Sequence, residues 1–463
     1  LSAARTGTSA LQSPIPAPCH LHGAMSAVQG EQVRVLHLMG SPTSEFYFDL
    51  AVMYGRTAVE FQGLDRSAFK HEYAVVFTDG KWAFPEALDP ESLKSAERFS
   101  LPIALGQIEA REPPVDVVMP HMFCVEGMTR YRALCEMMGL EVLGCPAQTC
   151  TIANDKFLTK QLCSSAGVPV PHGELLRADL HGADVDETAR QILARRATPL
   201  IVKPAREDNS IGLSLVKTSA NEELAAALAK AFQYDSHILV EEYVAGRECR
   251  VAVLEVEDST GSVRLEVLPK IEYLLDDIRT AQHKLATDEK GKLLSSGGNP
   301  ADAIVKAKKE NDRVCPAQFS PEVHQRLDDL ARRAHKALGC KYYSLYDVRI
   351  NEDGYPFMLE AALFCSFSPY SVVVALADKT GNEQLQPHPK VFEMLLRRAA
   401  AATRARRESG GDVQEAGTTG AIKGAIRVNG KATASQTPKS AVEDTASTVS
   451  GTGTQAAEVA LGA

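Results

Sequence analysis

Residues 343–361 read YSLYDVRINEDGYPFMLEA, and this stretch decides how the chain folds. Apolar residues on either side of the turn Asn351–Gly354 predict a buried β-hairpin. With an even number of residues in the loop, position 347 would lie opposite position 358. Asp347 and Glu360 would then point to one face of adjacent strands. Carboxylates brought together on apolar strands repel each other unless a proton or a cation offsets the repulsion.

The converging carboxylates predict a magnesium site with Asp347 and Glu360 as ligands. Mg²⁺ is a hard cation that takes carboxylate oxygens, and Mn²⁺ can replace it. The alternative is that each acid lies on a solvated strand edge. Met358, Leu359 and Ala361 favour the buried hairpin and therefore the metal.

A second chemical signature lies upstream, where residues 201–212 read IVKPAREDNSIG. The apolar start predicts a strand, and the remainder predicts a polar loop. Lys203 supplies a cation, while Ser210 and Gly212 leave backbone amides accessible, and binding of a polyphosphate requires both. A loop of this composition is as typical of a purely structural turn, so the neighbouring segments decide between the two.

Acidic residues close the next strand, at 238–242. Glu241 and Glu242, with Glu248 shortly after them, are able to accept hydrogen bonds from the amine of an adenine and from ribose hydroxyls. The alternative is a solvated strand end. Beside the loop at 203–212, these acids favour a bound nucleotide.

The remaining ordered chain alternates strands and helices, which predicts an α/β fold. A strand at 33–39 and another at 115–119, with helices after each, indicate a βαβ unit with a parallel sheet. Ser320 as N-cap, Pro321 and the stop at Gly339 predict one well-marked later helix. The predicted organisation is a leader at 1–32, an N-terminal α/β domain at 33–150, two α+β subdomains at 151–249 and 250–405, and a disordered tail at 406–463.

Composition excludes several classes of function. The chain has 463 residues, 44% hydrophobic and 24% charged, which suits two or three globular domains. Its net charge of -9 offers no basic surplus for nucleic acid or a membrane, and no apolar run is long enough to cross a bilayer. Ten cysteines, none at metal-binding spacing, are expected as core residues in a reducing compartment such as the cytoplasm. The acid-free residues 1–30 leave a plastid transit segment, a disordered leader or a fragment boundary as alternatives.

Taken in order, these segments resemble the D-alanine-D-alanine ligase branch of the ATP-grasp superfamily over about residues 33–400. The resemblance implies an N-terminal βαβ domain followed by two subdomains that enclose ATP, and an enzyme that forms carbon–nitrogen bonds. It implies that Lys156 and Lys203 hold the phosphates, and that Glu241 and Glu248 meet adenine and ribose. Its substrates would be ATP, an amino acid and a carboxylate or oxo acceptor, and the chain could form a homodimer.

The resemblance also assigns catalytic roles. Glu45 would orient the amino group of a substrate, and Lys284 would neutralise the transferred phosphate. Ser371 keeps its family position and, with Tyr370, would line the acceptor pocket. The polar stretch 287–302 would form part of a lid, or be a plain insertion.

Three positions depart from a D-alanine-D-alanine ligase. Leu345 stands where that enzyme has an arginine near the transferred phosphate, Ala362 where it has a metal-binding asparagine, and Leu285 where it has a tyrosine. Loss of the arginine removes a clamp on developing charge that can contribute about 3 to 4 kcal/mol. These departures predict a changed acceptor.

Several stretches resemble a specialised subgroup, the ligase of mycosporine-like amino acid biosynthesis. That resemblance implies that ATP phosphorylates the ring carbonyl of mycosporine-glycine, and that the amine of serine, threonine or another amino acid then displaces phosphate to give an imine. The alternatives are an ordinary D-alanine-D-alanine ligase and an ATP-binding protein without catalysis. The stretches are LHLMGS at 36–41, FYFD at 46–49, MFC at 122–124, GMTRYRAL at 127–134 and DNSIG at 208–212.

Overall fold

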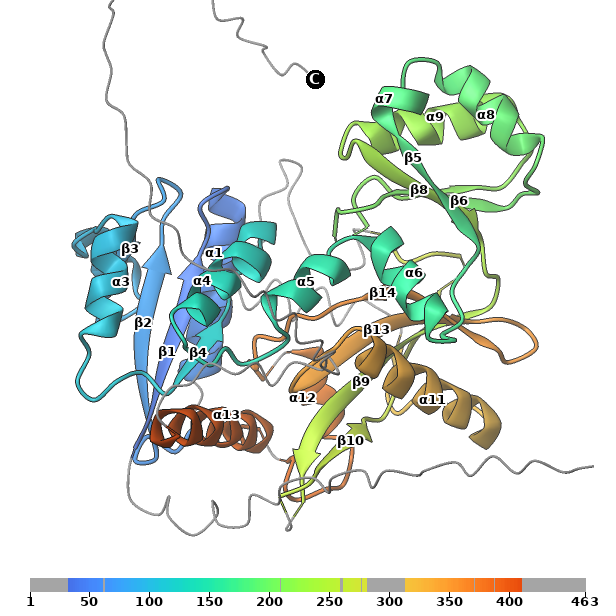
Figure 1. The fold of residues 1–463 in the computed structure, drawn as a ribbon. Helices are drawn as coiled ribbons and strands as arrows, with labels where there is room; N and C mark the ends of the chain where they lie inside the picture. The colour runs from blue at the N-terminus through green and yellow to red at the C-terminus, as the bar shows by residue number, and fades with distance from the viewer. Residues whose placement is uncertain are drawn as a thin grey trace, which may run out of the picture. The chain divides into compact units, whose positions relative to one another are not determined.

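Three β-sheets carry the fold in the computed structural model (Figure 1), and each has its own hydrophobic core. The structure describes residues 32–60, 63–208, 210–258, 261–275, 277–280, 313–369, 371–386 and 388–409. The leader before residue 32, the tail after residue 409 and the stretch 287–302 lie outside these ranges.

The first sheet has the order β3-β2-β1-β4, and β1 pairs in parallel with both β2 and β4. This confirms the expected parallel pairing for β2, β1 and β4, whereas β3 runs antiparallel to β2. Gly40 ends β1 at φ +97°, where a Cβ would come within 2.0 Å of the Val76 carbonyl oxygen, so only glycine fits. The elements are β1 (Val33–Gly40), α1 (Glu45–Val59), β2 (Phe69–Val76), β3 (Trp82–Ala83), α2 (Pro90–Ser95), α3 (Leu101–Glu109), β4 (Val117–Pro120), the π-helix η1 (Gly127–Tyr131) and α4 (Arg132–Met137).

The second sheet is antiparallel, with the order β5-β8-β6-β7. Helices α8 and α9 pack against each other, and α9 also contacts β6, β7 and β8. The elements are β5 (Gly173–Arg177), α7 (Ala178–His181), α8 (Val185–Leu193), β6 (Leu200–Pro204), β7 (Ser214–Val216), α9 (Asn221–Phe232) and β8 (His237–Glu242). Two helices precede this sheet, α5 (Ala147–Ala153) and α6 (Lys156–Ser165), and α6 contacts β14 of the third sheet.

The third sheet has six strands in the order β12-β11-β9-β13-β14, with β10 also paired to β9. Helix α11 begins as predicted, because Ser320 caps it through Val323 and Pro321 occupies its first turn. The elements are β9 (Arg247–Glu257), β10 (Val263–Val267), β11 (Ile271–Tyr273), β12 (Arg313–Val314), α11 (Pro321–Ala337), β13 (Tyr343–Ile350), β14 (Pro356–Ala361), α12 (Val372–Ala377) and α13 (Lys390–Glu408).

The hairpin β13–β14 forms as predicted, but its predicted register is wrong. Position 358 lies opposite Val348, and a bulge between Asp347 and Val348 shifts the next pair by one residue. Asp347 is therefore directly opposite Glu360. The two acids converge because a bulge re-aims the strand and not because the loop is even-numbered.

Helix α13 joins the two ends of the described chain, since it contacts β1 and β4 of the first sheet. The arginines in its last turns interact favourably with the negative end of the helix dipole and also form ion pairs. Arg404 and Arg407 pair with the buried Asp116, which also accepts a hydrogen bond from the Arg34 backbone amide at 2.9 Å. Among the described residues, no helix is long and apolar enough to span a bilayer, and the cysteines are free thiols that are buried except for Cys315.

Removing the Asp116 carboxylate should strongly destabilise the protein. Asp116→Ala leaves two arginines and a buried amide without their acceptor, which is expected to lower the free energy of unfolding by about 3 kcal/mol. Urea unfolding followed by circular dichroism measures this. The matched control is Asp179→Ala, whose ion pair with Arg177 is exposed and should contribute little. Equal effects of the two substitutions would contradict the anchoring role of Asp116.

Candidate active site

Two adjoining cavities form the site, with volumes of about 260 and 80 Å³. Lys156, Glu207, Arg279 and Glu360 line both of them. Because this wall is shared, the cavities are two compartments of one site, and charged side chains lie between them.

The smaller compartment collects most of the predicted nucleotide-binding residues. Lys203 from β6, Ser210 from the loop after it, and the acids Glu241, Glu242 and Glu248 line this cavity. Gly212 lies in the same loop at φ +71°, where a Cβ would come 2.7 Å from the Pro204 ring.

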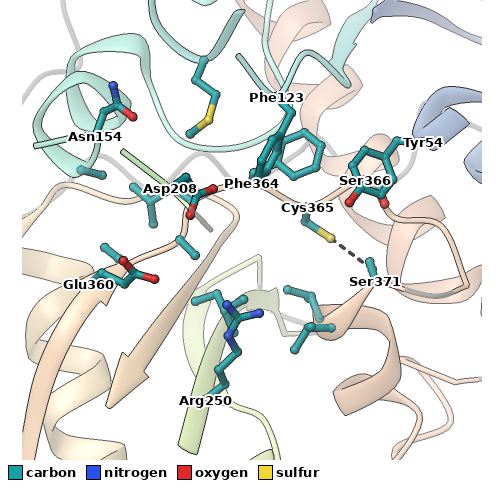
Figure 2. Close-up of a pocket in the computed structure, with 18 of the residues that line it drawn as sticks. Tyr54, Phe123, Asn154, Asp208, Arg250, Glu360, Phe364, Cys365, Ser366 and Ser371 are labelled. Carbon is teal, nitrogen blue, oxygen red and sulfur yellow. Dashed lines mark hydrogen bonds between the residues drawn. The ribbon is translucent and has the colours of Figure 1, made fainter. Parts of the chain in front are cut away.

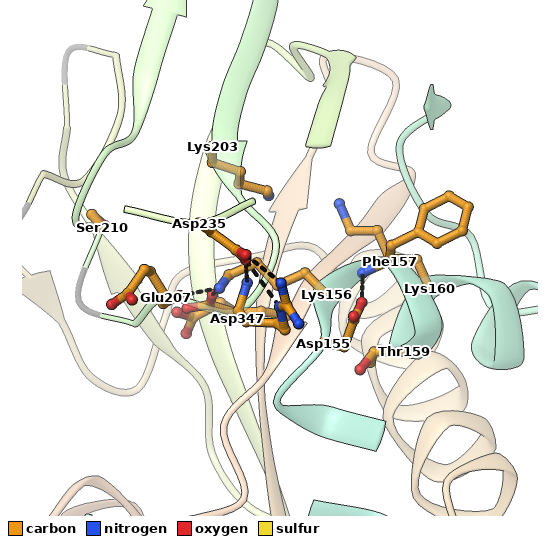
Figure 3. Close-up of polar contacts among 12 residues, drawn as sticks. Asp155, Lys156, Phe157, Thr159, Lys160, Lys203, Glu207, Ser210, Asp235 and Asp347 are labelled. Atoms are coloured by element: carbon orange, nitrogen blue, oxygen red, sulfur yellow. Dashed lines mark hydrogen bonds and ion pairs between the residues drawn. The ribbon is translucent and has the colours of Figure 1, made fainter. Parts of the chain in front are cut away.

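A buried carboxylate of this compartment, Glu241, binds two lysines. Lys203 Nζ donates to Glu241 Oε1 at 2.5 Å, and Lys160 Nζ donates to Glu241 Oε2. Figure 3 shows the two lysine side chains. Glu241 is 1% exposed and Lys203 9% exposed, so water screens these charges little. In this arrangement Glu241 orients the two lysines, and its assignment to adenine stays a prediction.

The pKa values of the two lysines are shifted in opposite directions. Burial lowers the pKa of Lys160 to about 7, against the opposing effect of Glu241. Burial also disfavours the charge on Lys203, but there the Glu241 carboxylate prevails and the pKa is raised above its ordinary value. Lys203 therefore keeps its positive charge at neutral pH, which contact with a phosphate requires.

The polar loop after β6 is tied to the start of α6 and to the third sheet. The Lys156 backbone amide donates to the Ala205 carbonyl at 2.9 Å, and Lys156 Nζ donates to the Glu207 carbonyl. Ser210 Oγ donates to the Arg279 carbonyl at 2.9 Å. These contacts bring Lys156 and the loop to the same wall of the site.

The hairpin carboxylates lie beside two arginines that the sequence analysis did not identify. Arg250 donates through Nε to Asp347 Oδ1 and through Nη2 to Oδ2 at 3.1 Å, and Arg279 Nη2 donates to Oδ2 at 2.6 Å. Burial disfavours the charge on each arginine, but Asp347 more than offsets it and raises both pKa values. Glu360 Oε2 lies 3.9 Å from Lys156 Nζ.

The donor set at the hairpin fits Mg²⁺. Asp347 and Glu360 offer only oxygen ligands from directly opposed positions. Among the described residues, no cluster of three or more histidine, cysteine, aspartate or glutamate side chains could hold a metal alone. Mg²⁺ is commonly bound by one or two carboxylates together with substrate phosphates, and the hairpin matches that pattern.

The larger compartment has an aromatic wall (Figure 2). Phe123 and Phe364 meet edge to face with ring centroids 4.8 Å apart, and the Tyr54 ring lies 5.4 Å from that of Phe364. Leu345 and Ala362, two of the positions that depart from a D-alanine-D-alanine ligase, line the same cavity. This compartment can therefore accommodate a largely apolar molecule next to the charged wall.

Of the predicted catalytic residues, Ser371 lines a cavity, Glu45 does not, and Lys284 lies outside the described residues. Ser371 lines the larger compartment, where it caps α12 through Val374 and accepts a hydrogen bond from Cys365 Sγ at 3.4 Å. Glu45 begins α1 and accepts a hydrogen bond from Thr78 at 2.7 Å, but it is absent from both cavity walls as described. Lys284 and Tyr370 lie outside the described residues, so their roles stay predictions.

Three cations of the site were missed, for different reasons. Lys160 follows Lys156 by four residues, so helical periodicity could have placed both on one face of α6. Arg250 faces Asp347 only through the β9–β13 pairing. Arg279 lies outside any helix or strand and carries no such pattern.

Comparison with known proteins identifies the family. Residues 162–286 match the family model for the C-terminal part of D-alanine-D-alanine ligase. Over 246 residues, 53% of this chain, the sequence is 30% identical to D-alanine–D-alanine ligase B of Chromobacterium violaceum and covers 69% of that protein. The chain belongs to the D-alanine-D-alanine ligase family. It is also 27% identical over 299 residues, 62% of this chain, to the D-alanine–D-alanine ligase of Geobacter sulfurreducens, of which it covers 81%.

Solved structures agree on the fold. The D-alanine-D-alanine ligase of Coxiella burnetii superposes with a TM-score of 0.59 at 18% identity, over 82% of this chain and 97% of that one. The VanG D-Ala:D-Ser ligase of Enterococcus faecalis gives 0.59 at 20% identity, over 79% of this chain and all of that one. The expected ATP-grasp fold is confirmed, and the chain is an ATP-dependent ligase of this family.

Substitution of Lys203 should weaken nucleotide binding. Lys203→Ala removes a cation from the nucleotide compartment and leaves Glu241 with Lys160 alone, so we expect ATP affinity to fall roughly 10-fold or more. Isothermal titration calorimetry measures the affinity. Lys336→Ala, on the exposed face of α11, is the control. Equal ATP affinities of the two variants would mean that Lys203 does not bind the nucleotide.

Substitution of Glu360 should weaken the metal site. Glu360→Gln keeps the shape of the side chain but removes a charged oxygen ligand. The magnesium concentration for half-maximal turnover is therefore expected to rise about 10-fold or more. Glu352→Gln, in the exposed hairpin turn, is the matched control. An unchanged magnesium requirement in Glu360→Gln would contradict the assignment of Glu360 as a metal ligand.

Proposed function

We propose that this ligase phosphorylates an acceptor oxygen and then joins the acceptor to the amine of an amino acid, and that its acceptor is bulkier and more apolar than D-alanine. The observation that carries the proposal is the wall of the larger compartment, where Tyr54, Phe123 and Phe364 stand with Leu345 and Ala362. A small zwitterion such as D-alanine would leave most of this apolar surface uncovered.

The charged residues between the compartments would position phosphoryl transfer. Lys156 and Lys203 hold the phosphates of ATP, and Lys284 remains the predicted partner of the transferred group. Mg²⁺, when bound by Asp347 and Glu360, would supply neutralisation of phosphate charge. Positioning and electrostatics of this kind provide most of the rate in phosphoryl transfer.

The second step places a demand on the acceptor compartment. Once the acceptor oxygen carries a phosphoryl group, phosphate leaves as the amine attacks, and water would compete with the amine. The aromatic rings and Leu363 would exclude water from the part of the compartment that they line. Glu45 would orient the incoming amino acid, as the family resemblance implies.

Mycosporine-glycine is the acceptor that we propose, joined to serine, threonine or a similar amino acid to give an imine. The flat, conjugated part of its cyclohexenone ring suits contacts with Phe123 and Phe364. The proposal rests on the resemblance of five short stretches to that subgroup and on the apolar character of the compartment.

D-alanine is the second candidate acceptor, and the relatives favour it. The proteins from Chromobacterium violaceum and Geobacter sulfurreducens carry the name D-alanine–D-alanine ligase. Against it stand Leu345 and Ala362, which line the site in place of an arginine and an asparagine.

Acceptor-dependent phosphate release, with the mass of the product, separates these candidates. With Mg-ATP, we expect release and an imine only when mycosporine-glycine and an amino acid are both present, and none with D-alanine alone. Formation of D-alanyl-D-alanine would establish the second candidate. ATP binding without phosphate release in either mixture would contradict both candidate acceptors.

A further inference from the structure

Arg250 supplies a cation on the face of the third sheet that also carries Asp347 and Leu345. It lies on β9 directly opposite Asp347 of β13, and Leu345 lies opposite Ala252 in the same pairing. Opposed residues, and residues two apart on one strand, share a face of a sheet. Arg250, Asp347 and Leu345 therefore face the same side, and Figure 2 shows Arg250 pointing from β9 into the cavity that Leu345 also lines.

The arginine pair shares its carboxylate with the predicted metal. Asp347 is 2% exposed and accepts hydrogen bonds from Arg250 and Arg279. A metal bound by Asp347 and Glu360 would draw on the same oxygens. Arg250, whose side chain is 18% exposed, would then need another anion, because a largely buried charge without a partner is costly. Among the described residues, Arg279 would keep only the more distant Glu248, whose Oε1 lies 3.5 Å from its Nε.

A phosphate is the anion that this geometry suits. A guanidinium offers a planar set of donors that matches two phosphate oxygens at once. Arg279 lines both compartments, and its guanidinium lies 4.1 Å from the Tyr273 ring centroid, which fixes its plane. Arg250 lines the acceptor side, so the pair flanks the route from nucleotide to acceptor.

We propose that Arg250, assisted by Arg279, binds the transferred phosphoryl group, and that the clamp missing at Leu345 has moved to the neighbouring strand. The inference rests on the proposed ATP-dependent reaction, but it does not depend on which acceptor is used. Without nucleotide, Asp347 holds the two arginines. With metal and nucleotide bound, the Asp347 carboxylate would bind the metal, and Arg250 and Arg279 would bind the phosphate.

The test compares the affinities of a non-hydrolysable ATP analogue and of ADP, with and without magnesium, by calorimetry. The proposal expects Arg250→Gln to lose roughly 10-fold or more of the preference for the analogue over ADP, since a charged hydrogen bond to the γ-phosphate is removed. Arg247→Gln is the matched control, because Arg247 lies on the same strand but pairs with Glu272 and lines neither cavity.

A second-site rescue separates a phosphate contact from a merely structural one. Leu345→Arg in the Arg250→Gln background returns a cation to the same face about 7 Å along the sheet, and it should restore the preference, whereas Leu345→Gln should not. If Arg250→Gln does not fold, Arg250→Lys, which keeps the charge but loses the planar fork, decides by the same comparison.

The outcomes are distinct. An Arg250→Gln variant that keeps the full preference overturns the proposal, and so does a change confined to magnesium affinity, which would mean that Arg250 only positions Asp347. Loss of the preference supports the clamp even if wild-type protein releases no phosphate with any acceptor. A lack of phosphate release by the wild-type protein would contradict the proposed function and not the role of Arg250.

Discussion

The site depends on the pairing of β13 with β14, in which a bulge after Asp347 sets it directly opposite Glu360. Two carboxylates are held together inside a largely apolar sheet, and their repulsion must be offset by cations. The structure meets that requirement with Arg250 and Arg279 at Asp347 and with Lys156 near Glu360. The concentration of positive charge that phosphates require follows from this one constraint.

The second sheet solves the same problem in the nucleotide compartment. Glu241 gathers Lys160 and Lys203 around one buried carboxylate, and the charge on Lys203 is kept at neutral pH. Acids thus orient cations in both compartments. An aromatic and aliphatic wall lines part of the larger compartment, next to these charged residues.

Sequence reasoning reached the features that are encoded locally. The strand that contains Lys203, the capped helix α11 and the hairpin β13–β14 each carry a short-range pattern, and the structure contains all three as expected. Features set by tertiary pairing were not accessible. Three features depend on residues that are far apart in the chain. They are the bulge that places Asp347 opposite Glu360, the position of Arg250 across the sheet from Asp347, and the ion pairs between α13 and Asp116.

A crystal structure with magnesium and a non-hydrolysable ATP analogue tests the central claim, that the hairpin acids and the surrounding cations form one phosphoryl-transfer site between two compartments. The account predicts the metal between Asp347 and Glu360, the base in the smaller compartment and the terminal phosphate beside Arg250. A terminal phosphate that points away from the larger compartment, or a metal bound by neither hairpin carboxylate, would contradict it.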